Sequence, residues 1–454
     1  MSELQNVPCY IEGMDDILGG FKSPAAILIA GSAGVGKTTM ALQMLANAAK
    51  AGEKALYIPL TTETAERFRL SLSTFKFLDD SVEVHEINRA NAEKDPLSTL
   101  IDIGNVITSV NPDRIVIDPI TPIGFGFVEQ ERRRFFYTLD SMIRESNALT
   151  FLIGELEKEE IHKNVASHLT DGIIYLSRSS RESRSYQEME ILKMRGVEPP
   201  YSIGCMIQSF NYSVNPENFR VFSDIKANGE IIKGEVISSG IEGFDEMISN
   251  KLQSGSSILV AGEPGSGKTV FGLQFINKSL ENGDKCVILT FYETVDQIIE
   301  NAASFGWDFR KHVDSGNLVI VSDGLQDICF AKYSNLIKEN IEQSNAKRVM
   351  IDGLPNIELS ITDPMKLRGF LHSLTNYLKE KGVTSLFTTE MTGAGWEKVN
   401  SLEASFIVDI LLVLKMTEDA DTTKRLLQVM KARGIPSNLT LKEFQIDEKG
   451  ITLG

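Results

Sequence analysis

The sequence predicts an α/β protein with two tandem domains, each built on a mainly parallel sheet flanked by helices. Three observations lead to this fold class. The second half of the chain repeats the motifs of the first half in the same order. Within each half, short apolar runs alternate with helical patterns, which is typical of a parallel sheet covered on both faces. Each half then closes with two apolar runs joined by polar residues, which favours an antiparallel extension at one edge of the sheet.

The internal repeat is visible in four short motifs. The matched pairs are Ile11–Asp16 with Ile241–Glu246, Gly31–Thr38 with Gly262–Thr269, Arg114–Asp118 with Arg348–Asp352, and Lys193–Gly196 with Lys431–Gly434. A period this long exceeds that of solenoid repeats, so two homologous domains are expected. Turn residues and low apolar content over 223–230 place the join there, and we predict domains at 1–228 and 229–454.

Four apolar runs in each half are predicted to form the parallel strands. They are Ala25–Ala30, Lys54–Ile58, Arg114–Ile117 and Leu149–Ile153 in the first half, and Ser257–Val260, Lys285–Leu289, Arg348–Ile351 and Thr384–Thr388 in the second. A helix is expected from Thr38 to about Lys50. The antiparallel pairs are expected at Asp171–Leu176 with Gln187–Leu192, and at Asp409–Leu414 with Lys424–Val429.

Composition and charge exclude several classes of protein. A chain of 454 residues that is 42% hydrophobic can bury a full core and is not disordered. The net charge of -16 argues against general binding to nucleic acid or to an anionic membrane. The sequence shows no apolar run as long as a membrane span, no signal-peptide pattern at its start and no CxxC pair among its four cysteines. We therefore expect a cytoplasmic protein without a metal cluster or disulfide framework.

Both Gly-rich loops match the phosphate-binding pattern GxxxxGK[ST] completely. Each follows a predicted strand and opens a helix, so backbone N–H groups and the helix N-terminus can surround the phosphates of ATP. In this pattern the lysine reaches the β/γ-phosphates and the final threonine binds Mg²⁺. Two matches in repeat register are not expected by chance. The loops consist of Gly31, Ser32, Ala33, Gly34, Val35, Gly36, Lys37 and Thr38, and of Gly262, Glu263, Pro264, Gly265, Ser266, Gly267, Lys268 and Thr269.

Carboxylates follow the predicted strands at matched positions of the two halves. Asp118 and Asp352 end apolar strands, where a carboxylate can hold a water molecule bound to Mg²⁺. Glu63 and Glu293 follow the second strand and are candidates for the general base that activates water. The alternative is a glutamate that only stabilises a helix N-terminus. A third pair could be γ-phosphate sensors or surface carboxylates: Glu155 and Glu390.

A Lys-x-Arg-Gly motif near the end of each half places two cations at positions i and i+2 of a strand end. The cations are Lys193 and Arg195 in the first half, and Lys431 and Arg433 in the second. Residues with this spacing lie on one face of a strand, and such a pair suits a triphosphate. A solvated basic corner is the alternative, and the repetition of the motif favours the functional interpretation.

The two loops, the lead-in Ile-Glu-Gly-Met/Phe-Asp and the late Lys-x-Arg-Gly together resemble the KaiC family of RecA-like ATPases. The resemblance covers nearly the whole chain. It implies two tandem RecA-like P-loop NTPase domains that bind ATP and Mg²⁺. It also implies an ATP-dependent homohexamer of two stacked rings with nucleotide between neighbouring subunits. Lys193 and Arg195 would then complete the sites of one ring from the adjacent chain, and Lys431 and Arg433 those of the other.

The chain departs from the circadian clock members of this family in two places. Those proteins often carry two adjacent glutamates after the second strand, whereas Thr62 and Tyr292 occupy the first of the two positions here. Slow hydrolysis, or hydrolysis that depends on the second carboxylate, is therefore expected. The clock proteins also phosphorylate an adjacent Ser-Thr pair in the second domain. Here Ser405 matches the serine but Phe406 replaces the threonine, so a two-site phosphorylation cycle is not expected.

We therefore predict an ATP-hydrolysing protein that forms an ATP-dependent double-ring hexamer and acts in signalling or regulation through unidentified protein partners. Serine autokinase activity at Ser405 is left open. A nucleotide-gated scaffold with little turnover is the first alternative, and the missing paired glutamates favour it. A RecA-type DNA-repair ATPase is less consistent with the sequence, because the chain is acidic and lacks a clear basic, Gly-rich DNA loop.

Overall fold

The computed structural model describes residues 5–61, 63, 65–88, 95–121, 129–161, 163–181, 184–196, 209–222, 234–322, 330–361, 364–391, 403–419 and 422–454. The chain divides into two compact units, Met1–Ser223 and Asp224–Gly454. The predicted domain boundary between residues 228 and 229 lies outside the described residues. No helix of the described part of the chain is both long and apolar enough to span a membrane.

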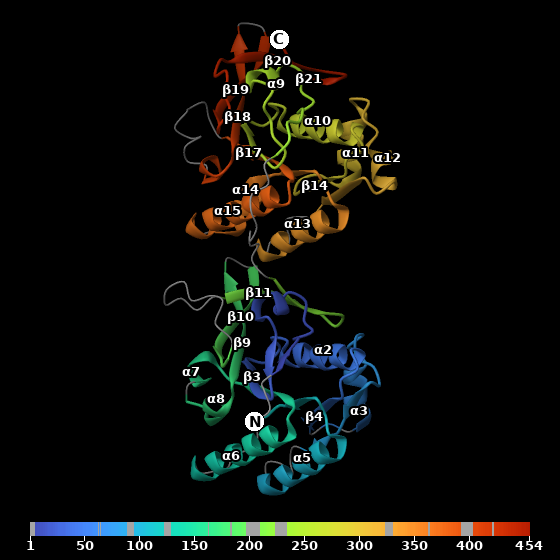
Figure 1. Cartoon of the computed structure of the whole chain (residues 1–454), viewed down its shortest axis with the longest axis vertical. Coiled ribbons are helices and arrows are strands. Elements are labelled where there is room, and N and C mark those ends of the chain that lie inside the picture. The colour runs from blue at the N-terminus through green and yellow to red at the C-terminus, as the bar shows by residue number, and fades with distance from the viewer. Residues whose placement is uncertain are drawn as a thin grey trace. The chain divides into compact units, whose positions relative to one another are not determined.

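The first unit contains one large sheet, several strands of which are labelled in Figure 1, and one small sheet formed by two strands. Its strands are β1 (Gln5–Val7), β2 (Phe21–Ser23), β3 (Ala25–Gly31), β4 (Ala55–Thr61), β5 (Val82–Val84), β6 (Ile87–Asn88), β7 (Arg114–Asp118), β8 (Leu149–Glu155), β9 (Gly172–Arg181), β10 (Arg184–Met194), β11 (Ser209–Val214) and β12 (Phe219–Phe222). The order in the large sheet is β12-β11-β10-β9-β3-β8-β7-β4-β5, with β6 paired to β4. The neighbouring strands β9, β3, β8, β7, β4 and β5 run parallel to one another. At the other edge, β10, β11 and β12 are each antiparallel to their neighbours.

The second unit repeats this topology. Its strands are β13 (Ser257–Gly262), β14 (Cys286–Thr290), β15 (Leu318–Ser322), β16 (Arg348–Asp352), β17 (Thr384–Glu390), β18 (Ile410–Asp419), β19 (Thr422–Ala432), β20 (Lys442–Asp447) and β21 (Gly450–Leu453). Their order is β15-β14-β16-β17-β13-β18-β19-β20-β21, and the last three are antiparallel to their neighbours. The predicted α/β fold with an antiparallel edge extension is thus confirmed in both units.

Helices cover both faces of each large sheet. Those of the first unit are α1 (Met14–Leu18), α2 (Lys37–Lys50), α3 (Ala65–Leu72), α5 (Pro96–Val110), α6 (Glu129–Ser146), α7 (Lys158–Ile161) and α8 (Val165–Leu169). Those of the second are α9 (Phe244–Met247), α10 (Lys268–Glu281), α11 (Val295–Ala303), α12 (Phe309–Asp314), α13 (Phe330–Ser344), α14 (Leu354–Ser360), α15 (Pro364–Glu380) and the 3₁₀ helix η3 (Glu403–Phe406).

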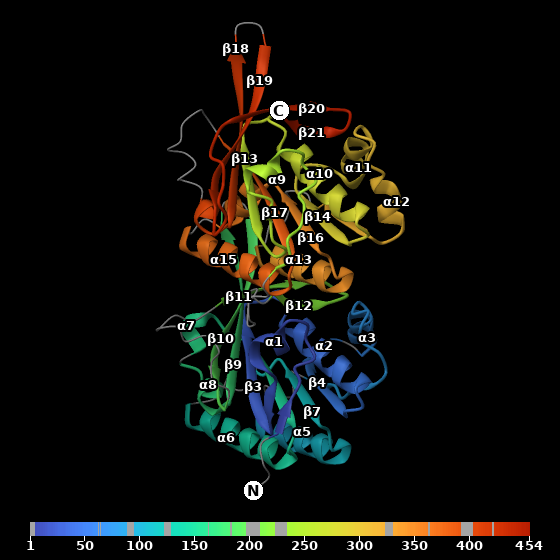
Figure 2. The same ribbon diagram turned by 45° about the horizontal axis from the view of Figure 1, so that its top comes forward.

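The buried central strands divide each core into two clusters. Successive side chains of a strand point to opposite faces of the sheet. Ile27 and Ile29 of β3 therefore pack with residues of α2, whereas Leu28 and Ala30 pack with residues of α5 and α6. Figure 2 shows α2 on one side of this sheet and α5 and α6 on the other. β13 separates α10 from α13 and α15 in the same way. Burial on both faces explains why these strands are continuous apolar runs.

Candidate functional site

The first Gly-rich loop connects the C-terminal end of β3 to the N-terminus of α2, which begins at Lys37. Gly34 and Gly36 have φ angles of 76° and 97°, in the left-handed region that glycine adopts without strain. A Cβ atom at Gly36 would also lie 3.0 Å from a methyl group of Val214 in β11. Glycine at position 36 is therefore required both by the backbone conformation and by the close packing of β11.

The lysine of each loop folds back over its own loop. Lys37 Nζ donates hydrogen bonds to the carbonyl groups of Gly31 (2.9 Å) and Ser32 (2.6 Å). Lys268 Nζ donates to the corresponding carbonyl groups of the second loop at 3.0 and 2.9 Å. Burial lowers the pKa of both lysines, and nearby carboxylates oppose this shift. Each loop thus holds a partly buried cation among its backbone groups, as a phosphate site requires.

A threonine and an aspartate come together beside each lysine. Thr38 Oγ1 donates a hydrogen bond to Asp118 Oδ2 at 2.6 Å, and Thr269 Oγ1 donates to Asp352 Oδ2 at 3.2 Å. The two aspartates are buried, and burial raises the pKa of each carboxyl group. A hydroxyl and a carboxylate are the oxygen ligands that Mg²⁺ prefers in nucleotide sites, so these residues fit a Mg²⁺–nucleotide complex. The predicted metal residues are therefore adjacent in both units.

Different hydroxyl groups support the two aspartates. Tyr57 of β4 donates a hydrogen bond to Asp118 Oδ2 at 3.3 Å. In the second unit, Thr388 of β17 donates to Asp352 Oδ1, and its hydroxyl also accepts the N–H of Gly353 at 2.9 Å. Neither Tyr57 nor Thr388 was predicted from the sequence. Both are hydroxyl residues in the strand next to the one that carries the aspartate, but β17 contains four hydroxyl residues, so the sequence does not single out Thr388.

The two candidate general bases have different surroundings. Glu63 is exposed, and its carboxylate lies 3.7 Å from Arg67 Nε. Glu293 is half-buried, and its Oε1 accepts a hydrogen bond from Asn301 at 2.8 Å. Its Oε2 atom is buried without a hydrogen-bond partner among the described residues. Burial and the negative charge of Asp352 raise the pKa of Glu293. Glu293 is therefore the better placed of the two to hold and deprotonate a water molecule.

Glu155 and Glu390 lie at the same edge of the sheets as the loops. Glu155 ends β8, the strand between β3 and β7, and Glu390 ends β17, the strand between β13 and β16. Both side chains are exposed. Burial lowers the pKa of Lys37 and Lys268, and the charges of Glu155 and Glu390, respectively, oppose this shift. Their positions are compatible with both interpretations of this pair, a γ-phosphate sensor and a surface carboxylate.

The Lys-x-Arg pairs lie at the opposite end of each sheet from the loop of the same unit. Lys193 is paired with Ile173 at the start of β9, whereas Leu176 of β9 packs against Gly31 of the loop. At about 3.3 Å per residue, these two positions of β9 are roughly 10 Å apart along the strand. Lys193 Nζ donates to the carbonyl groups of Ser167 (3.2 Å) and Thr170, on the side away from the loop.

The remaining members of the two pairs have similar surroundings. Arg195 is 58% exposed, and its Nη1 lies 3.2 Å from Asp171 Oδ1. Lys431 Nζ donates to the carbonyl groups of Ser405 (2.8 Å) and Phe406 (3.3 Å), and Arg433 also donates to Phe406. The structure thus brings lysine and arginine together in each unit, but it does not bring them to the loop of the same unit.

Ser405 and Phe406 lie in η3, next to the second basic pair. The Ser405 side chain is buried at 8% exposure, whereas Phe406 is 56% exposed. The guanidinium group of Arg368 lies 5.7 Å from the centre of the Phe406 ring. The larger aromatic side chain, and not the hydroxyl group, is therefore presented to the solvent at this position.

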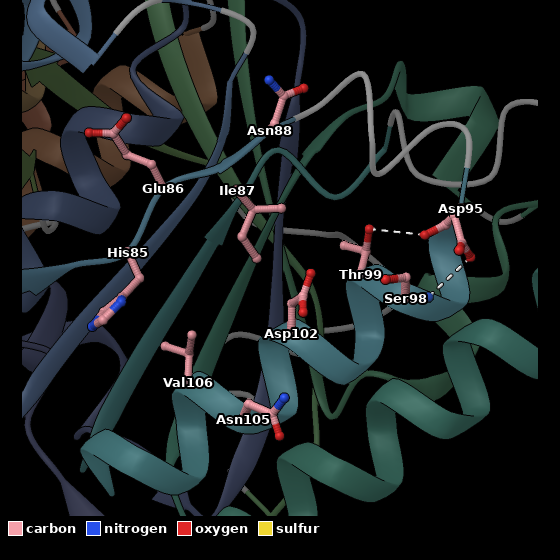
Figure 3. A pocket seen from close by; sticks show the side chains of 10 residues that line it. All are labelled: His85, Glu86, Ile87, Asn88, Asp95, Ser98, Thr99, Asp102, Asn105 and Val106. Atoms are coloured by element: carbon pink, nitrogen blue, oxygen red, sulfur yellow. Dashed lines mark hydrogen bonds between the residues drawn. The ribbon is translucent and has the colours of Figure 1, made fainter.

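A pocket of the first unit lies between the β5–β6 stretch and α5 (Figure 3). At its rim Asp95 accepts hydrogen bonds from Ser98 N (3.1 Å) and Thr99 Oγ1 (3.2 Å) at the start of α5. No lysine or arginine is among its described lining residues, and carboxylates repel phosphate, so this pocket does not suit a triphosphate. The lining residues are His85, Glu86, Ile87, Asn88, Asp95, Ser98, Thr99, Asp102, Asn105 and Val106.

A family model for the KaiC ATPase matches the chain twice, over residues 7–207 and 237–454. The chain belongs to the KaiC family of ATPases. Each match includes a Gly-rich loop and the aspartate whose carboxylate contacts the threonine of that loop. The second match includes the Lys-x-Arg pair at 431 and 433. The first match also includes Lys193 and Arg195. KaiC-type ATPase domains therefore account for most of the chain.

Similar proteins are circadian clock proteins of cyanobacteria. KaiC3 of Synechocystis sp. is 26% identical over 479 aligned residues, which cover 99% of this chain and 92% of that protein. The clock oscillator protein KaiC of Prochlorococcus marinus (strain MIT 9313) is 27% identical with the same coverage. KaiC of Synechococcus elongatus is 26% identical over 97% of this chain and 87% of its own length. The chain is thus similar to these relatives over nearly its whole length, at modest identity.

Proposed function

We propose that this KaiC-family ATPase binds Mg²⁺–ATP in both units, hydrolyses it, and assembles as an ATP-dependent double-ring homohexamer in signalling or regulation. The observation that carries the nucleotide sites is the contact of Thr38 with Asp118, repeated as Thr269 with Asp352, beside the loop lysine. The lysine and threonine begin α2 or α10, whereas the aspartate ends β7 or β16. They converge at the edge of the sheet where α/β proteins bind ligands.

Each residue of a site has a distinct task in this proposal. The loop N–H groups and Lys37 or Lys268 bind the phosphates. The threonine and aspartate orient Mg²⁺, which when bound offsets charge on the β- and γ-phosphates. Glu293, and Glu63 in the first unit, take the proton from the attacking water. Without a positioned base and a cation at the transferred phosphate, ATP would be bound but hydrolysed slowly.

The basic pairs are proposed to complete the sites of a neighbouring chain. Lys193 and Arg195 face away from their own loop, and so do Lys431 and Arg433, which supports action on a nucleotide bound elsewhere. A cation supplied across a subunit boundary stabilises transition-state charge. A ring in which each chain supplies cations to the next closes with every site complete, so this geometry favours a closed ring over a monomeric enzyme. The number of six subunits comes from the family resemblance.

Transfer of phosphate to Ser405 is the less favoured part of the function. Ser405 is buried at 8% exposure, and Phe406 beside it cannot accept phosphate. Phosphorylation would therefore require η3 to open first. A regulatory role does not depend on this step, because ATP-dependent assembly alone can change which surfaces are presented to partners.

Loop variants separate the two sites and test the proposal. Lys37→Ala and Lys268→Ala should each remove about half of the bound nucleotide, and the double variant should remove nearly all of it, because each lysine serves one site. Equilibrium binding and steady-state phosphate release should be measured on the same samples. Full stoichiometry in either single variant contradicts that site.

A scaffold with little turnover is the second candidate function. The exposed position of Glu63 and its contact with Arg67 favour slow hydrolysis in the first unit. If the protein is such a scaffold, Lys37→Ala and Lys268→Ala should still each lose nucleotide binding. The unmodified chain, however, should release no more phosphate than the double variant.

A further inference from the structure

The antiparallel extension of the first unit contacts the Gly-rich loop directly. Tyr212 of β11 is 3% exposed, and its hydroxyl group donates a hydrogen bond to the carbonyl oxygen of Val35 at 2.6 Å. The ring of Tyr212 stacks on Phe219 of β12, with centroids 4.9 Å apart and planes 19° apart. Stacking and burial fix the ring, so the hydroxyl group acts on the loop from a rigid position.

This hydrogen bond orients the peptide group that follows Val35. In a planar trans peptide, the C=O of one residue and the N–H of the next point in opposite directions. The bond from Tyr212 therefore directs the N–H of Gly36 away from β11. Val214, also in β11, lies so close to Gly36 that a Cβ atom there would be 3.0 Å from its methyl group, which limits movement of the loop toward the extension. An N–H group held in this direction belongs to the set that this loop pattern offers to phosphate.

Among the described residues of the second unit, this hydrogen bond has no counterpart. The register of β19 with β20 matches that of β10 with β11, so Phe444 occupies the position of Tyr212 and Ile446 that of Val214. Ile446 lies against Gly267 as Val214 lies against Gly36. Phe444 is 2% exposed and carries no hydroxyl group, so the peptide group before Gly267 is not held from this strand by a side-chain donor.

The residue at the Val35 position in the second loop is also different. Ser266 is fully buried, and its Oγ atom has no hydrogen-bond partner among the described residues. A Cβ atom at Gly262 would lie 2.6 Å from this Oγ atom, so the serine side chain is directed into its own loop. The two loops match in sequence pattern but are supported by different groups.

We infer that Tyr212 is a positioning residue that raises the nucleotide affinity of the first site, and that Phe444 leaves the second site without this support. The inference rests on the proposed function, since it concerns how tightly a proposed ATP site binds. The loop loses less conformational entropy when it binds nucleotide if one of its peptide groups is already oriented. The effect should lie in ground-state binding, because the orientation is present before ATP arrives.

The test measures the first site alone, in a chain that carries Lys268→Ala. In that background Tyr212→Phe should weaken Mg²⁺–ATP binding by roughly three- to tenfold, as expected for the loss of one buried hydrogen bond. KM should rise by the same factor with kcat unchanged, which is the signature of lost uniform binding. Titration calorimetry at one fixed protein concentration provides the affinity, and phosphate release provides the two kinetic constants.

Two further variants make the result specific. Tyr10→Phe removes another tyrosine hydroxyl of the same unit, which donates to Glu53 at 3.1 Å, and it should leave the affinity unchanged. In a Lys37→Ala chain, Phe444→Tyr should tighten the second site. If the parent binds ATP through Lys37 and Tyr212→Phe binds it with the same affinity, the inference is wrong. The proposed function is not affected by that result. Absence of Lys37-dependent binding in the parent overturns the proposed function itself.

Discussion

At the scale of single residues, the two halves of the chain differ most around the candidate general base. Glu63 is exposed and close to Arg67, whereas Glu293 is half-buried beside Asn301 with one unpartnered oxygen among the described residues. An exposed carboxylate already binds bulk water, while a half-buried one can hold a single water in a fixed place. The second unit is therefore the better candidate for hydrolysis, although both halves have kept the same glutamate.

The pKa of Glu293 leads to a prediction for the pH dependence of the second site. Burial and Asp352 raise this pKa, and a general base works only when it is ionised. In a Lys37→Ala chain, phosphate release should therefore decline on acidification at a pH above the ordinary glutamate value of about 4.3. The hydrogen bond from Asn301 lowers the same pKa, so Asn301→Ala should move the decline to a still higher pH.

The control for this prediction is Arg310→Ala, which removes an exposed ion pair with Asp296 elsewhere in the second unit and should leave the profile in place. If Asn301→Ala shows the same acidic limb as its parent, Glu293 does not limit the rate.

At the scale of elements, a buried arginine at the start of β7 ties three segments of the first unit together. Arg114 is fully buried, and its Nη2 donates to Glu53 Oε1 (3.1 Å) after α2 and to the carbonyl of Pro8 (2.8 Å) before α1. Its guanidinium group also lies 4.7 Å from the centre of the Tyr10 ring. Arg348 occupies the same place in the second unit but donates to two carbonyl groups and stacks on Phe275.

Removal of Arg114 should destabilise the first unit strongly. Arg114→Met keeps much of the side-chain volume but leaves Glu53 without its cation, and breaking a buried pair in this way costs about 3 kcal/mol or more. Urea unfolding, followed by circular dichroism, measures the change in the free energy of unfolding. Lys76→Ala removes an exposed ion pair with Glu217 in the same unit and should change stability very little. A similar small change for both variants would show that Arg114 is dispensable for stability.

At the scale of the whole molecule, the position of the basic pairs predicts that activity depends on assembly. Addition of ATP should convert the chain to a hexamer in a size measurement by light scattering. Arg195→Ala should retain nucleotide binding and lose turnover at the first site, because the cation acts on the transition state of a neighbouring chain. With the second site silenced by Lys268→Ala throughout, mixing Arg195→Ala chains with Lys37→Ala chains should restore part of the activity.

The restoration has a simple cause: a chain with an intact loop receives its arginine from a neighbour whose own loop is inactive. Mixed rings that form without any gain in phosphate release would show that each site is complete within one chain.

The sequence by itself determined the architecture of the molecule. Repeated motifs and apolar runs predicted two α/β units with parallel strands and an antiparallel edge, and the structure confirms them. This worked because the strands are buried on both faces, so they appear as continuous apolar runs that periodicity can detect. The two Gly-rich loops could also be recognised in the sequence, since a left-handed backbone and backbone groups that bind phosphate restrict the residues that fit. The start of the helix after the first loop differed by one residue, at Lys37 instead of Thr38.

Only the tertiary structure decided which side chains act on those loops. Tyr57, Thr388 and Tyr212 are each far in sequence from the group that they contact. The pattern of a strand does not distinguish such a hydroxyl from its neighbours, such as Thr389 beside Thr388. The different surroundings of Glu63 and Glu293, and the placement of the basic pairs away from their own loops, likewise depend on strand order and register. Local sequence patterns record the conformation of a segment, whereas contacts between segments arise only when the sheet brings them together.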